Sequence, residues 1–204
     1  MKKSVIVLLV LVLTFGFFNV RAETTEDIVW TEVLEEDGVN FSYDKFDKQW
    51  EYYGAYVKKY SDATFVWGIQ VVGERNSKSK ISGIYVYSWV RDEYNRESIY
   101  KIESMKVLIG DKIFTLPMQV GENSSYVWIA REDADRQFLV ELMSAKEVSI
   151  KLDLGSNTFS MDLPGEDIED IKTVARDIIK FRMFDYCDEE VMQNWHDSYP
   201  LTVE

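Results

Sequence analysis

The most regular pattern in the chain is an alternation of apolar and polar positions in its last third. Apolar side chains occupy every second position on either side of the polar segment 155–157; they are Val148, Ile150, Leu152, Leu154, Phe159, Met161 and Leu163. Strict alternation is typical of strands that have one face on a core and the other in water. Gly155 opens the segment between them, and glycine favours tight turns because it adopts positive φ at no steric cost. The sequence therefore predicts a β-hairpin over 148–163.

Earlier segments are rich in β-branched and aromatic residues, which favour strands. The predicted strands are 28–33, 39–43, 64–72, 81–90, 98–109, 112–116 and 125–130. Gly110 and Asp111 predict a hairpin turn between two of them. Residues 50–60 fit both a helical stripe and a strand face, and their aromatic content together with Gly54 favours a strand.

Two segments change to helical spacing of their apolar residues. In 131–145 these residues are Phe138, Leu139, Leu142 and Met143. In 166–183 they are Ile168, Ile171, Val174, Ala175, Ile178 and Ile179. Acidic residues precede both stripes, and negative charge at a helix start interacts favourably with the helix dipole. The sequence predicts an amphipathic helix in each segment.

These elements together predict an α+β domain of about eight to ten short strands and two helices. The connections are too short for parallel crossovers, so most strand pairs should be antiparallel. We expect a β-sandwich-like domain over 23–183, with one helix before the 148–163 hairpin and one after it. Residues 184–204 form an acidic C-terminal tail.

The N-terminal segment 1–22 has a pattern of its own. Lys2 and Lys3 precede an almost unbroken apolar run over 4–18, and Ala22 ends a short segment of small or modest residues. This three-part pattern is typical of a secretory signal peptide. The alternative is a retained anchor, although the run is somewhat short of the roughly 20 residues that a spanning helix needs. We expect cleavage, export to the periplasm or the medium, and no stable membrane insertion afterwards.

Charge and rare residues exclude several classes of function. The 204-residue chain has 23 Lys and Arg against 36 Asp and Glu, a formal net charge of −13, which disfavours nucleic acid as a partner. One Cys and one His are too few for a disulfide framework or for the common zinc sites. The acidic runs lack the spacing of an EF-hand calcium loop. We therefore expect no metal and no cofactor.

No catalytic motif stands out in the sequence. The single histidine, His196, lies in the tail, and neither a nucleophile elbow nor a glycine-rich phosphate loop is present. Glycoside hydrolysis needs only two carboxylates about 5–10 Å apart in a cleft. The sequence offers 36 acidic residues and no means of choosing such a pair.

The order of elements resembles that of small bacterial exported proteins of unassigned function. The matching pieces are the segment Tyr43-Asp44-Lys45-Phe46-Asp47, the strand 125–130, the helix 131–145, the hairpin 148–163 and the helix 166–183. The resemblance covers most of 39–183. It implies a β-rich exported domain and carries over no catalytic residue.

Aromatic residues supply the candidate binding site. The chain has 6 Trp, 12 Tyr and 11 Phe, and Tyr85, Tyr87 and Trp89 share one face of the predicted strand 81–90. Trp50, Tyr52 and Tyr56 share another face if 50–60 is a strand. Such residues most often fill the space between two sheets, and otherwise form a surface that stacks on sugar rings or anchors a protein.

These observations favour a non-catalytic, extracytoplasmic binding protein whose partner is an envelope component or another protein. The alternatives are a small carboxylate-dependent glycan hydrolase and a structural or assembly partner in the cell envelope.

Overall fold

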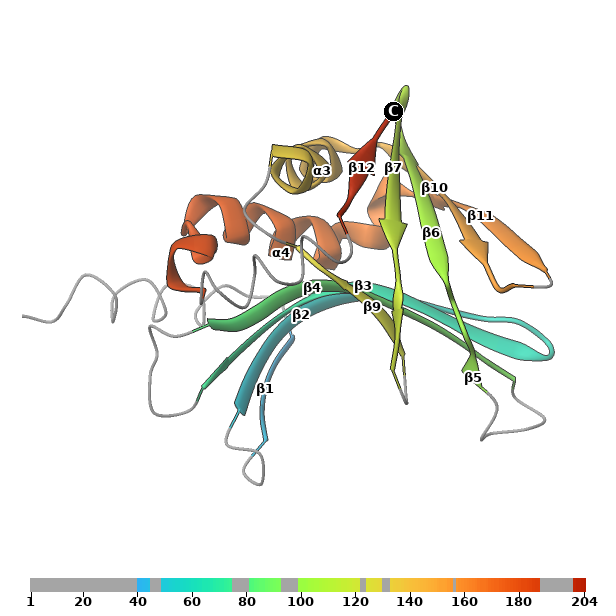
Figure 1. The fold of residues 1–204 in the computed structure, drawn as a ribbon, viewed down its shortest axis with the longest axis horizontal. Helices are drawn as coiled ribbons and strands as arrows, with labels where there is room; N and C mark the ends of the chain where they lie inside the picture. The colour runs from blue at the N-terminus through green and yellow to red at the C-terminus, as the bar shows by residue number, and fades with distance from the viewer. Residues whose placement is uncertain are drawn as a thin grey trace, which may run out of the picture.

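The computed structural model describes residues 40–44, 49–74, 81–92, 99–121, 124–129, 133–155, 157–187 and 200–204. The predicted signal segment 1–22, the predicted strand 28–33 and His196 lie outside these residues. Two antiparallel sheets and two helices make up the described part, and the helices lie in its C-terminal half (Figure 1). The α+β, mainly antiparallel fold predicted from the sequence is thereby confirmed.

The larger sheet, here called sheet A, has seven strands in the order β1-β2-β3-β4-β9-β8, with β5 also paired to β4. Its strands are β1 (Asn40–Asp44), β2 (Gln49–Lys59), β3 (Ala63–Glu74), β4 (Ile81–Asp92), β5 (Ile99–Tyr100), β8 (Gln119–Val120) and β9 (Ser125–Trp128). The ambiguous segment 50–60 is a strand, as its aromatic content predicts. The sheet is arched, and the helices and the second sheet lie on its convex side (Figure 1).

The second sheet, sheet B, has the order β11-β10-β6-β7-β12. Its strands are β6 (Ser104–Ile109), β7 (Lys112–Pro117), β10 (Glu147–Asp153), β11 (Thr158–Pro164) and β12 (Thr202–Val203). Both predicted hairpins are present. Gly110 at φ 64° and Gly155 at φ 79° turn the chain in the left-handed region that favours glycine.

The predicted strand 98–109 is wrong as a single strand. It is divided into β5, which pairs with β4 in sheet A, and β6, which pairs in sheet B. Ile102 and Met105 are both fully buried although they are three positions apart, so the two-residue period is interrupted between them. The backbone N–H of Ile102 donates to Oγ of Ser125 at 3.1 Å, which secures the chain where it changes sheets.

The end of the chain also enters sheet B. Residues 184–204 are predicted as a tail outside the domain, but β12 pairs with β7 through Thr202 opposite Thr115 and Val203 opposite Phe114. The adjacent Leu201 is buried. A two-residue strand has too little pattern to be recognised in the sequence.

The two predicted helices are α3 (Asp133–Ser144) and α4 (Glu169–Lys180). A 3-10 turn, η1 (Gly165–Ile168), precedes α4, and a second one, η2 (Met183–Tyr186), follows it. The apolar stripe of α4 is buried as predicted, with Ile171, Val174, Ala175 and Ile178 fully covered. Gly54 lets α4 approach β2 closely, because a Cβ there would collide with the Asp170 carbonyl and lie 2.7 Å from the Ile171 nitrogen.

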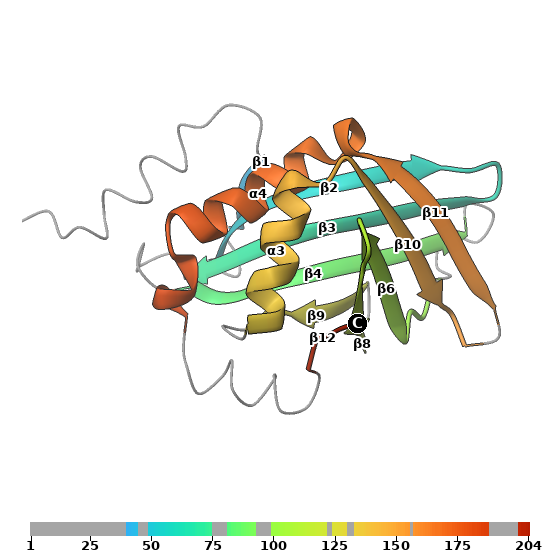
Figure 2. The ribbon, with the colours of Figure 1, turned by 90° about the horizontal axis from the view of Figure 1, so that it is seen from above.

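The core lies between sheet A and the layer formed by sheet B and the helices. Viewed from above, sheet B crosses one part of sheet A, while α3 and α4 lie over another (Figure 2). Fully buried side chains include Phe65, Trp67, Ile69 and Val71 of β3. No described helix or strand covers the opposite, concave face of sheet A (Figure 1).

Candidate functional site

Alternation along β4 sends its side chains to opposite faces of sheet A. Ile84 and Val86 are fully buried in the core, whereas Tyr85, Tyr87 and Trp89 lie on the concave face and are half-buried. The three aromatic residues therefore do not fill the space between the two sheets. Of the two interpretations of this strand, core filling is wrong, and the binding surface stays a prediction.

Tyr85, Tyr87 and Trp89 line a hollow of about 530 Å³ on this face. The other described residues that line it are Glu51 and Tyr53 of β2, Gln70 of β3, and Ser124 and Tyr126 at β9. Small-molecule sites in proteins have volumes of about 300–1,000 Å³. The hollow is therefore large enough for a ligand of a few rings.

Strand register brings the lining residues together. Gln70 is directly opposite Tyr53 on one side and Tyr85 on the other, and directly opposed residues point to the same face. Tyr87 is opposite Tyr126 of β9. The Tyr85 and Tyr126 rings lie 6.1 Å apart at an interplanar angle of 50°. The hollow thus has aromatic walls from three strands.

Sequence reasoning missed Glu51, Tyr53 and Tyr126 as members of this site. It grouped Tyr52 with Trp50 and Tyr56 as a second aromatic face, and for Tyr52 the binding-surface interpretation is wrong. Tyr52 is 1% exposed in the core, where its hydroxyl donates a hydrogen bond to Oδ2 of Asp177. The signal that could have found Glu51 and Tyr53 is strand alternation, because every second residue of β2, counted from Glu51, points to the concave face.

A glycine lies against the ring of Tyr87, one of the walls of the hollow. Gly68 is directly opposite Tyr87 and Ala55. A Cβ at Gly68 would lie 2.7 Å from Cζ and Oη of Tyr87, so the ring lies across the glycine. The glycine therefore gives the tyrosine room to lie along the sheet.

The hydroxyls of Tyr85 and Tyr87 stay protonated at neutral pH. Burial raises the pKa of Tyr85 well above its usual range, and the charge of Glu51 and the nearby Tyr126 raise it further. The pKa of Tyr87 is raised by burial, then by Tyr53 and Glu51. A protonated phenol both donates and accepts hydrogen bonds. Half-buried tyrosines thus give the hollow polar groups without charge.

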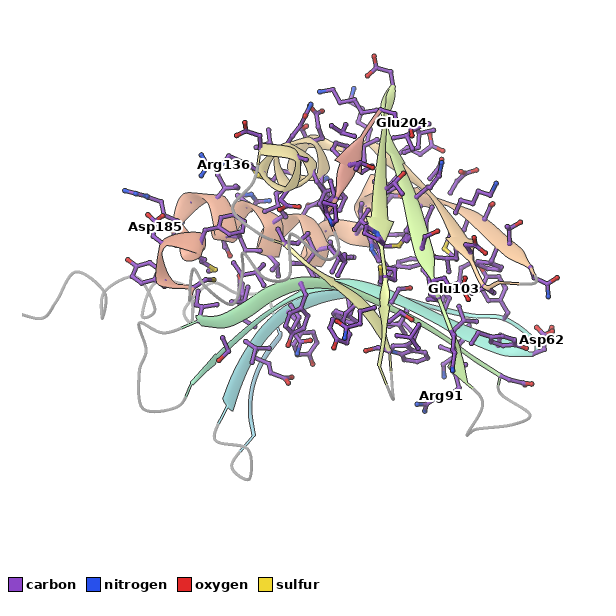
Figure 3. The ribbon with its side chains drawn as sticks, in the orientation of Figure 1. Asp62, Arg91, Glu103, Arg136, Asp185 and Glu204 are labelled. Carbon is purple, nitrogen blue, oxygen red and sulfur yellow. The ribbon has the colours of Figure 1, made fainter. Side chains whose placement is uncertain are left out.

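Arg91 lies just beyond the hollow on the same face of β4 (Figure 3). Its Cζ is 5.3 Å from the centroid of the Trp89 ring, within the range of a cation–π contact. Its buried Nε has no hydrogen-bond partner among the described residues. Stacking on Trp89 is a contact that the structure gives this guanidinium.

Comparisons with known proteins do not assign the chain to a family. No family model, no curated protein and no solved structure matches the chain.

Other candidate chemistry is sparse in the described part of the chain. No group of three or more His, Cys, Asp or Glu side chains there is placed to hold a metal ion. Cys187 is buried, and burial raises the pKa of its thiol to about 12. The thiol is therefore protonated near neutral pH and a poor nucleophile. No described helix is both long and apolar enough to cross a membrane.

Proposed function

We propose that the protein is an exported, non-catalytic binding protein that takes a glycan of the cell envelope in the aromatic hollow of sheet A. The observation that carries the proposal is the placement of five aromatic side chains around one open hollow on a face that no described element covers. They are Tyr53, Tyr85, Tyr87, Trp89 and Tyr126. The predicted signal peptide supports the location of the protein outside the cytoplasm.

The composition of the lining suits a carbohydrate. Aromatic rings offer flat apolar surfaces on which the C–H faces of sugars stack. Between the rings lie the amide of Gln70, the hydroxyl of Ser124 and the tyrosine hydroxyls. These groups donate and accept hydrogen bonds, as the hydroxyls of a sugar require. An aliphatic ligand would cover these polar groups without offering them hydrogen bonds, which is unfavourable.

The single carboxylate of the described lining favours binding over hydrolysis. Two-carboxylate hydrolysis requires an acid and a second carboxylate about 5–10 Å apart. Among the described residues that line the hollow, Glu51 is the only carboxylate. Glycan binding needs no such pair.

Calorimetric titration of the purified protein with short neutral and charged oligosaccharides tests the proposal. We expect at least one of them to bind, and Trp89→Ala to weaken its binding at least about tenfold through the loss of one stacking surface. Tyr100→Ala is the matched control, because Tyr100 of β5 is an exposed aromatic of sheet A outside the hollow lining. If no oligosaccharide binds, or if both variants bind like the wild type, the proposal is wrong. Sugar products in the titrated mixture would instead support the hydrolase.

A further inference from the structure

Charge is distributed unevenly along the concave face of sheet A. Glu51 is the only charged side chain among the described residues that line the hollow. Lys59 of β2 and Arg91 of β4 lie at the other end of the face, because each is directly opposite Thr64 of β3. Glu51 and Lys59 are eight residues apart on β2, about 26 Å at 3.3 Å per residue. The face is therefore acidic at one end, aromatic in the middle and basic at the far end.

We infer that the glycan bound in the hollow carries free, positively charged amino groups, and that the Glu51 carboxylate pairs with one of them. This inference rests on the proposed function and specifies its ligand as an amino-sugar glycan. It predicts a preference for positively charged glycans, which glycan binding alone does not require.

The position of Glu51 supports the pairing. Glu51 is two residues from Tyr53 on β2, so both side chains point to the concave face. Its charge raises the pKa of both Tyr85 and Tyr87, which places the carboxylate within electrostatic reach of two walls of the hollow. An ammonium group among these rings would lie within the same reach.

The aromatic walls of the hollow also favour a positively charged ligand. The face of a Tyr or Trp ring is electronegative and attracts a cation within about 6 Å of its centroid. Arg91 already occupies such a position on Trp89, at 5.3 Å. The formal net charge of −13 acts in the same direction at longer range. An anionic sugar would instead meet Glu51 and the negative ring faces.

Lys59 and Arg91, at the basic end of the face, do not cancel the preference of the hollow for a cationic ligand. Arg91 is level with Lys59 through Thr64, and Lys59 is eight residues from Glu51 along β2, about 26 Å. Charges at that distance from Glu51 are largely screened at physiological ionic strength, where the Debye length is about 8 Å. Lys59 and Arg91 therefore limit the length of a cationic ligand, and the amino group nearest Glu51 carries the recognition.

The test compares the trimer of glucosamine with the trimer of N-acetylglucosamine, at a pH at which the free amines are protonated. The two ligands differ in charge at the same positions of the sugar. We expect the wild-type protein to bind the amine form about five- to tenfold more tightly at low salt, and the preference to shrink as salt is added. Tri-lysine serves as a source of the same charge without sugar rings and should bind far more weakly.

Two isosteric variants test whether the preference for the amine form arises from the lining of the hollow. Glu51→Gln should remove most of the preference for the amine form. Gln70→Glu adds a second carboxylate to the same lining and should increase the preference. Equal binding of both trimers, with no effect of either variant, would overturn this inference and leave glycan binding intact. Failure of both trimers and of all other oligosaccharides would overturn the proposed function itself. Tri-lysine binding as tightly as the glucosamine trimer would show that the sugar is not recognised.

Discussion

The ring of Tyr87 lies across Gly68 on the neighbouring strand, where a Cβ would come within 2.7 Å of Cζ and Oη of the tyrosine. The two residues are directly opposed in the β3–β4 register. This contact connects the fold to the candidate site, because the missing side chain at one position sets the orientation of an aromatic wall at the other.

Gly68→Ala should therefore affect both stability and binding. The added methyl group would also lie 2.5 Å from the carbonyl oxygen of Gly54, a backbone atom that cannot rotate away. We expect a loss of about 1–3 kcal/mol in the free energy of unfolding, as is typical of overpacking, together with weaker binding of the oligosaccharide. Urea denaturation and calorimetry measure the two effects. Unchanged stability would mean that Tyr87 does not lie across the glycine.

Gly54→Ala tests the close approach of α4 to β2. A Cβ there would collide with the Asp170 carbonyl and with the Ile171 nitrogen, both part of the helix backbone. We expect a loss of about 2–4 kcal/mol, since the whole helix must shift. Gly155→Ala is the comparison: its nearest neighbour is the Glu103 carboxylate at 3.5 Å, and only its φ of 79° is unfavourable. That variant should lose about 1 kcal/mol, and a loss as large as that of Gly54→Ala would contradict the argument.

Tyr52→Phe and Tyr53→Phe form a matched pair on opposite faces of β2. Tyr52 is buried and donates a hydrogen bond to the buried carboxylate of Asp177 on α4, whereas Tyr53 lines the open hollow. Loss of a buried hydrogen bond that leaves one partner unsatisfied costs about 1–3 kcal/mol. We expect that loss for Tyr52→Phe and less than about 0.5 kcal/mol for Tyr53→Phe. Equal urea midpoints for the two variants would place the two hydroxyls in similar surroundings, contrary to the structure.

The raised pKa values of Tyr85 and Tyr87 predict a loss of stability in alkali. The folded protein holds these two protons more tightly than the unfolded chain, whose tyrosines titrate near pH 10. Their contribution is therefore fully present below about pH 10 and falls as pH rises above it. Tyr85→Phe/Tyr87→Phe should show a shallower decline of the unfolding free energy above that pH. Identical slopes for the variant and the wild type would show that the hydroxyls are not protected by folding.

The sequence predicted those features that depend on short-range pattern. The alternation around Gly155 and Gly110 predicted both hairpins, the apolar stripe of α4 predicted its buried face, and β-strand parity placed Tyr85 and Tyr87 on one face. Each of these follows from residues within a few positions of one another.

Features that depend on pairing between strands distant in the sequence were not predicted. Tyr53 and Tyr126 join Tyr85 and Tyr87 only because of the register across β2, β3, β4 and β9. A one-residue slip of β2 would have placed Tyr52 there in place of Tyr53. The break between β5 and β6 likewise depends on a contact of Ile102 with Ser125, 23 positions further along the chain.

The fluorescence of Trp89 gives the most direct test of the aromatic hollow as the binding site. Trp89 lines the hollow, whereas Trp67 is fully buried in the core. Titration of the protein with the oligosaccharide that it binds should change the tryptophan emission, and Trp89→Phe should abolish most of that change while a ring remains for stacking. The same emission change in the variant and the wild type would place the ligand elsewhere and contradict the account.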